Sequence, residues 1–265
     1  MPSPKKFVFP KPCASRFAAR IFATAIGGVL GFMISISPAC AAGPVERAQS
    51  IGEVVGGSAR TPDARAADFS NEAASSAARL LADWVVASRD NQKSPFIIVD
   101  KVNAKLLLFD AQGTIRAAAP VLLGLGRGDD SPPGIGARKL ATMTPAERIT
   151  PAGRFVASRG ENLSGQDILW VDYEAAISIH RATDLKPGLS AKDRLTRLDS
   201  ASSLDNRISH GCINVSESFY DSYIRPTFAA TAGIVYILPE TRSVNEVFGL
   251  PPEQQAQRAV SRPGG

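Results

Sequence analysis

The chain has 265 residues, of which 44% are hydrophobic and 21% are charged, and its formal net charge is +5. A basic chain suggests nucleic-acid binding, which requires a clustered basic surface. Here the whole excess lies near the N-terminus, at Lys5, Lys6, Lys11, Arg16 and Arg20. The remainder is close to neutral, so the composition excludes a nucleic-acid-binding protein.

Residues 1–42 have the features of an export signal. The basic residues precede an apolar stretch at 21–36, and small residues such as Ala39 and Ala41 follow at the positions that signal peptidase prefers. The apolar stretch is short for an uncleaved anchor, which needs roughly 20 residues. We therefore expect a periplasmic protein that meets the membrane only through this signal. Cleavage would remove Cys13 and Cys40 and leave Cys212 as the one thiol.

Residues 43–94 are expected to form a linker and one docking helix. The part up to residue 67 is rich in small and polar residues and poor in large apolar ones. Residues 69–88 then carry apolar side chains at helical spacing, and Asp68 or Ser70 is a candidate cap. The apolar stripe predicts that this helix docks on the main domain.

Residues 95–239 predict a mostly β domain with a few short helices. Short apolar runs separated by turns lie at 96–100, 105–109, 114–123, 154–158, 168–173, 176–180 and 233–238. The glycines at 124–128 lack the lysine and hydroxyl of a phosphate-binding loop, so a turn between strands is expected. Short helices are predicted at 191–198 and after Ser216, and residues 240–265 are expected to be a peripheral tail.

The residues best suited to chemistry lie close together in the sequence. His180, His210 and Cys212 include both histidines of the chain, and all three fall in the single stretch from position 180 to position 212. Histidine moves protons near neutral pH, and cysteine is a strong nucleophile. A helix expected just after Cys212 would favour its thiolate, and Gly211 would let main-chain N–H groups face an oxyanion. A lone cysteine can also be a buried, inert residue, but the neighbouring histidine favours acyl transfer from an amide.

Three motifs resemble the L,D-transpeptidase (YkuD-type) family of bacterial cell-wall enzymes. They are Ile179-His180, the block Ser209-His210-Gly211-Cys212-Ile213-Asn214, and the turn Thr150-Pro151-Ala152-Gly153-Arg154-Phe155. The resemblance covers roughly residues 95–239 and implies a β-sandwich-like catalytic domain.

The resemblance also implies roles for individual residues. Cys212 would be the nucleophile, and His180 the general base, oriented by the backbone carbonyl of Arg181. From its place in the sequence alone His210 is the candidate base, but the resemblance places it beside the thiol instead. The N–H groups of Gly211 and Cys212 would bind the oxyanion, and the expected substrate contacts are Ser209, Asn214, Arg181 and Tyr173. The spacer between His180 and Ser209, at 181–208, is long, so residues 184–206 are either a determinant of substrate choice or a solvated loop.

The implied reaction is on peptidoglycan stem peptides. Cys212 would attack the bond between diaminopimelate and D-alanine and pass the acyl group to an amine. The acceptor is left open between another stem, giving a 3→3 cross-link, a lysine of an outer-membrane lipoprotein, a D-amino acid and water. The alternatives are a hydrolase of the same fold and a non-catalytic cell-wall binding protein. No cofactor is expected, because two histidines and one cysteine are too few for a closed zinc site.

Overall fold

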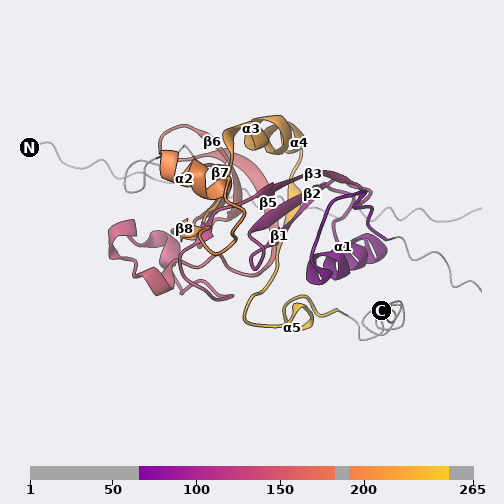
Figure 1. Cartoon of the computed structure of the whole chain (residues 1–265), viewed down its shortest axis with the longest axis horizontal. Helices are drawn as coiled ribbons and strands as arrows, with labels where there is room; N and C mark the ends of the chain where they lie inside the picture. The colour runs from indigo at the N-terminus through magenta and orange to yellow at the C-terminus, as the bar shows by residue number, and fades with distance from the viewer. Residues whose placement is uncertain (1–65, 183–190, 251–265) are drawn as a thin grey trace, which may run out of the picture. The chain divides into compact units, whose positions relative to one another are not determined.

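The computed structural model describes residues 66–182 and 191–250, and strands dominate this part of the chain (Figure 1). The predicted signal peptide and most of the predicted linker lie outside the described residues. Eight strands form one sheet in the order β3-β2-β1-β10-β5-β6-β7-β9, and β4 pairs with β8. The strands are β1 Phe96–Asp100, β2 Lys105–Phe109, β3 Ile115–Pro120, β4 Leu123–Gly124, β5 Gly153–Glu161, β6 Asp167–Asp172, β7 Ile177–Arg181, β8 Arg207–Ser209, β9 Ile213–Val215 and β10 Gly233–Ile237. The predicted mostly β fold is confirmed.

The long strand β5 divides the sheet into two halves. Its residues 153–157 pair with β10, whereas residues 158–161 pair with β6. Apolar side chains from both halves meet in a single core that includes Ile97, Leu108, Leu169 and Ile179. Because successive side chains of a strand face opposite sides of the sheet, each strand contributes alternate residues to this core. The sheet is therefore folded on itself, as in a sandwich.

The two ends of the sheet come together next to the predicted site. Leu122, which follows β3, exchanges two backbone hydrogen bonds with Asn214 of β9, each 2.9 Å long. The eight-stranded sheet is thereby nearly closed. This pairing fixes the backbone of β9 from the side opposite to β7.

The helices are α1 Ser76–Ser88, α2 Ala191–Leu198, α3 Glu217–Phe219, α4 Arg225–Thr227 and α5 Val244–Phe248, with 3-10 turns η1 Ile135–Ala137, η2 Leu140–Thr142 and η3 Pro145–Glu147 and a π-turn η4 Tyr220–Ile224. The helix predicted at 191–198 and the Ser216 cap of the following helix are confirmed. The glycines at 124–128 carry no helix, and Gly124 belongs to β4. No helix of the described residues has the length and hydrophobicity that crossing a membrane requires.

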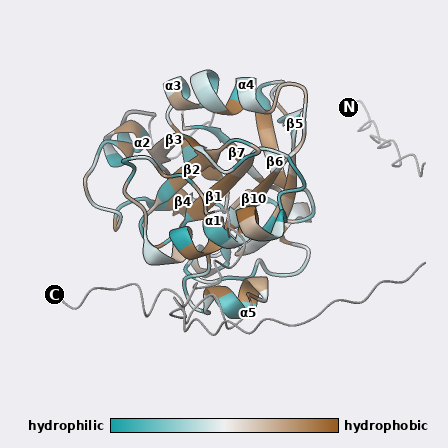
Figure 2. Ribbon diagram, turned by 90° about the vertical axis from the view of Figure 1, so that its right-hand side faces the viewer, coloured by the Kyte–Doolittle hydropathy of each residue, from teal (hydrophilic) through white to brown (hydrophobic). Residues whose placement is uncertain are grey.

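Helix α1 docks on the outer face of the sheet, as its apolar stripe predicted. Figure 2 shows α1 lying against the sheet beside β1 and β10. Leu81 and Val85 are fully buried in a cluster with Phe96 and Tyr236 of these strands. The predicted start was wrong. The Ser75 hydroxyl caps the helix by accepting from the Ala78 N–H, well after Asp68 in the sequence.

Asp68 instead pairs through its backbone with the segment at the start of β3. Its backbone N–H donates to the carbonyl of Gly113, and its carbonyl accepts from the N–H of Ile115. A residue engaged by these bonds is not at a helix start. The contact ties the segment before α1 to the beginning of β3.

The segment expected to be a peripheral tail begins with buried contacts. The Glu240 side chain is 3% exposed and pairs with Arg207. The α5 helix follows behind a capping box formed by Ser243 and Glu246, and Leu250 is buried. Residues 240–250 therefore belong to the folded domain, and the rest of the predicted tail lies outside the described residues.

Candidate active site

Cys212 lies in a tight connection between β8 and β9. Gly211 adopts φ +129°, and a Cβ atom there would meet the Ile149 carbonyl oxygen at 2.8 Å. The position therefore requires glycine. The Ser209 hydroxyl closes the turn, donating to the Cys212 carbonyl at 2.6 Å and accepting from the Gly211 N–H at 3.0 Å.

This turn corrects two expectations about Cys212. The strand β9 separates the cysteine from α3, so the thiol does not lie at a helix N-terminus. The Gly211 N–H is engaged by Ser209, which leaves the Cys212 N–H as the predicted oxyanion donor. Ser209 itself is 2% exposed, so its side chain holds the turn rather than a substrate.

Strand β7 supplies the partners of the thiol. Ser178 and His180 are two residues apart and so face the same side of the strand. The Cys212 Sγ lies 3.6 Å from the Ser178 hydroxyl and 3.5 Å from the Ala176 carbonyl oxygen. Burial raises the pKa of the Cys212 thiol, but the hydrogen bond and charge of His180, together with Ser178, outweigh it and hold that pKa below its ordinary value. The site therefore favours the thiolate, which is the nucleophilic form.

A directed series of hydrogen bonds fixes the tautomer of His180. Arg194 can only donate, so the Asn214 atom 3.0 Å from its Nη1 is the amide oxygen. The Asn214 NH₂ group then donates to His180 Nε2 at 3.0 Å. Because Nε2 accepts, the ring proton is on Nδ1, which donates to the Arg181 carbonyl at 2.8 Å. With Nδ1 engaged in this way, Nε2 carries the basic lone pair of the ring, and it must release its hydrogen bond from Asn214 to take the thiol proton.

The side chains of Arg181 and Asn214 are not placed to bind a substrate. Arg181 is 9% exposed, forms ion pairs with Asp167 and Asp221 and stacks 4.3 Å above the Tyr220 ring. These carboxylates raise its pKa further against the effect of burial. Asn214 is completely buried between Arg194 and His180. Arg181 therefore contributes its backbone carbonyl, and Asn214 positions the histidine.

His210 and Tyr173 remain open to solvent. His210 is half-buried, and burial followed by the charges of Arg148 and Arg194 lowers its pKa. Tyr173 is 71% exposed, packs against Trp170 with the ring centres 4.6 Å apart and the planes tilted by 45°, and belongs to the turn that carries Ala176. The Ala176 carbonyl of this turn lies against the thiol, and the substrate contact of Tyr173 stays a prediction.

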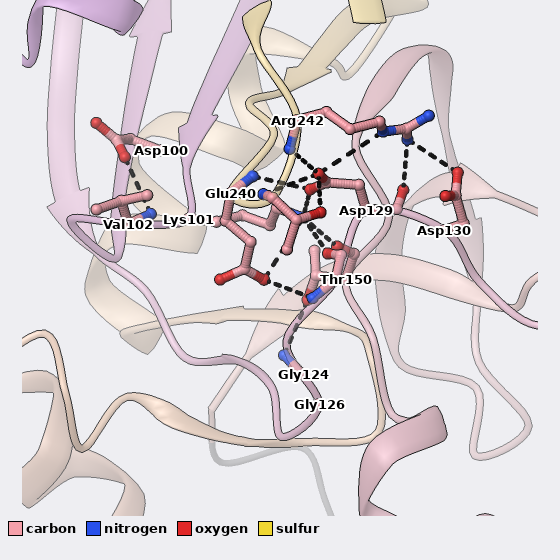
Figure 3. A network of polar contacts seen from close by, with 12 residues as sticks. Asp100, Lys101, Val102, Gly124, Gly126, Asp129, Asp130, Thr150, Glu240 and Arg242 are labelled. Atoms are coloured by element: carbon pink, nitrogen blue, oxygen red, sulfur yellow. Dashed lines mark hydrogen bonds and ion pairs between the residues drawn. The ribbon is translucent and has the colours of Figure 1, made fainter.

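A buried polar network joins Lys101, Asp129 and Thr150 (Figure 3), and Thr150 extends it to the turn that carries Cys212. The Thr150 hydroxyl donates to the Gly211 carbonyl and accepts from the Gly124 N–H, both at 2.8 Å. The Thr150 carbonyl in turn accepts from Lys101 Nζ at 3.0 Å. Lys101 is almost fully buried and pairs with Asp129 at 2.8 Å.

The sequence analysis had missed Ser178, Arg194 and Lys101. Ser178 was visible as the polar residue two positions before His180 in an apolar strand, and Lys101 as the second of two charged residues that follow the apolar run 96–99. Arg194 carried no such indication in its polar segment. Among the described residues, no three His, Cys, Asp or Glu side chains lie together in a way that would hold a metal ion.

Comparisons with known proteins give structural likeness alone. No family model matches the chain, and no curated protein matches it. Similar solved structures include the helical cell shape determining protein Pgp2 from Campylobacter jejuni, at 16% identity and a TM-score of 0.37, covering 57% of this chain and 49% of that one. An L,D-transpeptidase from Xylanimonas cellulosilytica has 14% identity and a TM-score of 0.33, with 54% and 60% covered. The catalytic domain of an Enterococcus faecium L,D-transpeptidase has 16% identity and a TM-score of 0.29, with 55% and 98% covered.

The chain spans only about half the length of Pgp2 and 60% of the Xylanimonas structure. At this level of similarity neither the family nor the activity follows from the comparison.

Proposed function

We propose that this protein is a peptidoglycan L,D-transpeptidase of the bacterial periplasm. The observation that carries the proposal is geometric: Cys212 Sγ lies 3.6 Å from the hydroxyl of Ser178, on the strand that carries His180, and His180 Nδ1 donates to the Arg181 carbonyl. The lowered pKa of the thiol agrees with this arrangement. The sequence motifs around His180 and Cys212 supply the resemblance to the family, and residues 1–42 supply the export signal.

In the proposed reaction Cys212 attacks the carbonyl carbon between the L-centre of diaminopimelate and D-alanine. His180 Nε2 takes the thiol proton, and the Cys212 N–H donates to the oxyanion. Collapse of the tetrahedral intermediate breaks the C–N bond, and His180 returns its proton to the departing D-alanine amine. The product of this half-reaction is a thioester on Cys212.

The second half-reaction transfers the acyl group to an amine. The acceptor loses a proton to His180 as its nitrogen attacks the thioester, and the thiol is regenerated when the C–S bond breaks. An acceptor amine on another stem gives a 3→3 cross-link, and a lysine of an outer-membrane lipoprotein gives protein attachment. Cys212 is partly exposed, so the same acyl-enzyme supports hydrolysis as the alternative where water reaches the thioester.

The test is to incubate the purified protein with a disaccharide-tetrapeptide and identify the products by mass spectrometry. We expect a cross-linked dimer that lacks one D-alanine, formed by the wild type and not by Cys212→Ala. Monomeric tripeptide as the sole product would favour the hydrolase. No product, together with a Cys212 that does not react with thiol reagents, would contradict an enzymatic role.

A further inference from the structure

Arg194 occupies an environment that proteins rarely give to a charge. Its side chain is buried, with 8% of the residue exposed, and among the described residues its hydrogen bond runs from Nη1 to Asn214. The Nε atom is buried without a hydrogen-bond partner, and no carboxylate pairs with this guanidinium among the described residues. Burying an unpaired charge costs several kcal/mol, and a buried unsatisfied donor requires an explanation.

The packing of α2 shows why Arg194 is held inside. Arg194 and Leu198 are four residues apart and therefore share one face of the helix. Leu198 is buried in a small apolar cluster with Leu122, Ala182 and Ile208, which seats that face against the domain. The contact turns Arg194 towards Asn214, the partner of His180.

The surroundings of Arg194 are electropositive. Both Arg194 and Arg148 act on His210, and the groups that shift the pKa of that histidine include no carboxylate. The Arg148 guanidinium donates to the Met143 carbonyl and, within the described ranges, faces no acidic side chain. Two arginines thus adjoin the site that contains Cys212, and neither charge is compensated there.

We propose that Arg194 binds a carboxylate group of the substrate next to Cys212. A guanidinium stays protonated even when buried and offers its N–H groups as a planar fork that matches a carboxylate. The proposal rests on the proposed function and adds to it a determinant of substrate choice, provided by α2 in the long spacer between His180 and Ser209. Two carboxylates of a tetrapeptide stem fit this chemistry, the C-terminal one of D-alanine and the side-chain one of diaminopimelate.

The first experiment needs no stem peptide. Iodoacetate and iodoacetamide alkylate the same thiol with the same leaving group, but the first carries a carboxylate. The ratio of their rate constants therefore reports anion binding beside Cys212 and cancels changes in thiol reactivity. We expect Arg194→Gln to lower this ratio about tenfold, as the loss of one charged hydrogen bond implies, and the exposed Arg116→Gln, with the same charge change, to leave it as in the wild type. An unchanged ratio in Arg194→Gln would overturn the proposal.

The second experiment identifies the carboxylate. Acylation rates are measured with the free tetrapeptide stem, with its C-terminal amide and with its diaminopimelate amide. Amidation of the bound carboxylate should slow the wild type about tenfold and have little effect on Arg194→Gln. If the variant instead loses the same factor on all three substrates, Arg194 acts only by holding Asn214, and the proposal is wrong.

Misfolding of Arg194→Gln and failure of the proposed function can each be told apart from failure of the Arg194 proposal. If Arg194→Gln fails to fold, Arg194→Lys replaces it, and we expect this variant to keep the charge and most of the alkylation ratio while losing part of the discrimination between stems. If the wild type is acylated by none of the stems, the proposed function fails, whereas the alkylation ratio still decides whether Arg194 binds an anion.

Discussion

His180 depends on its neighbours to act as a base. A neutral imidazole has one protonated and one accepting nitrogen, and a base needs the accepting one to face the thiol. The Arg181 carbonyl accepts a hydrogen bond from Nδ1–H, and the Asn214 amide donates to Nε2, which fixes Nε2 as the unprotonated nitrogen. Both neighbours are placed by the backbone, because β7 and β9 pair His180 directly with Asn214.

The pKa of Cys212 gives a prediction about reactivity and pH. Because that pKa is held below its ordinary value, the reactive thiolate persists to lower pH than in a free cysteine, and alkylation slows only as the pH falls through the lowered pKa. In His180→Gln, burial becomes the dominant influence, so the midpoint should move above the ordinary value. The measurement is the iodoacetamide rate between pH 5 and 10.

The matched control for this pH profile is His210→Gln. His210 is not among the groups that shift the pKa of Cys212. Its removal should leave the midpoint where it is in the wild type. Equal midpoints in the wild type and His180→Gln would contradict the assignment of His180.

Asn214 gives a second prediction at this scale. Asn214→Ala removes the donor to His180 and the acceptor of Arg194, so acylation should fall about 100-fold and stability by about 1–3 kcal/mol. The control is Asn206→Ala, another buried asparagine, which donates to the Val121 carbonyl. It should lose similar stability but keep its acylation rate, measured on protein shown to be folded. If Asn214→Ala is acylated at the wild-type rate, Asn214 is not required to hold His180 in the tautomer with its proton on Nδ1.

At the scale of elements, the sequence patterns located strands β1 and β2 better than they located the start of helix α1. Both β1 and β2 begin and end where their apolar runs predict, because each run fills one strand of a buried sheet. The start of α1 was misplaced because Asp68 and Ser75 are equally good caps by residue type. A backbone contact with Gly113 and Ile115, which lie far along the chain beyond β2, decided between them.

The residues of the site likewise fall into those that residue type reveals and those that only strand pairing places. The motif around Cys212 identified the thiol and both histidines, since their chemistry is a property of residue type. The short strand β9 was missed because its structure comes from pairing with β7, which lies on the far side of the long spacer in the sequence. For the same reason the sequence analysis treated Asn214 as a substrate contact, although pairing places it inside the domain beside His180.

The turn between β8 and β9 gives a prediction at the scale of elements. Thr150→Val keeps the shape of the side chain but leaves the Gly124 N–H and the Gly211 carbonyl without their partner. We expect a loss of about 1–3 kcal/mol and an acylation rate lowered about tenfold, since the turn positions Cys212. Thr150→Ser retains the hydroxyl and should stay close to the wild type in urea unfolding and in rate. Equal behaviour of the two variants would mean that the hydroxyl does not hold the turn.

Across the whole molecule, Asp129 joins segments that are far apart in the sequence. Its carboxylate accepts from the backbone N–H groups of Glu240, Thr241 and Arg242 and pairs with Lys101 at the end of β1. Through Lys101 and Thr150 the same network reaches Gly211, next to the thiol. The segment after β10 is thus connected to the site by buried polar contacts.

This network predicts how stability depends on pH. Burial raises the pKa of Asp129, but Lys101, Thr241 and the backbone N–H groups outweigh it and hold that pKa well below its ordinary range. A carboxyl whose pKa is depressed by folding stabilises the native state above its unfolded pKa, about 3.9, and loses that contribution as the pH falls towards the folded value. Asp129→Asn should therefore lower the thermal midpoint most at pH 7, by the equivalent of about 3–5 kcal/mol, and the difference from the wild type should begin to shrink below about pH 4 and go on shrinking towards the folded pKa. The neighbouring Asp130→Asn is the control, because its side chain is 79% exposed and its pair with Arg242 should contribute less than about 1 kcal/mol. Parallel pH profiles for the wild type and Asp129→Asn would show that this carboxylate does not anchor the chain.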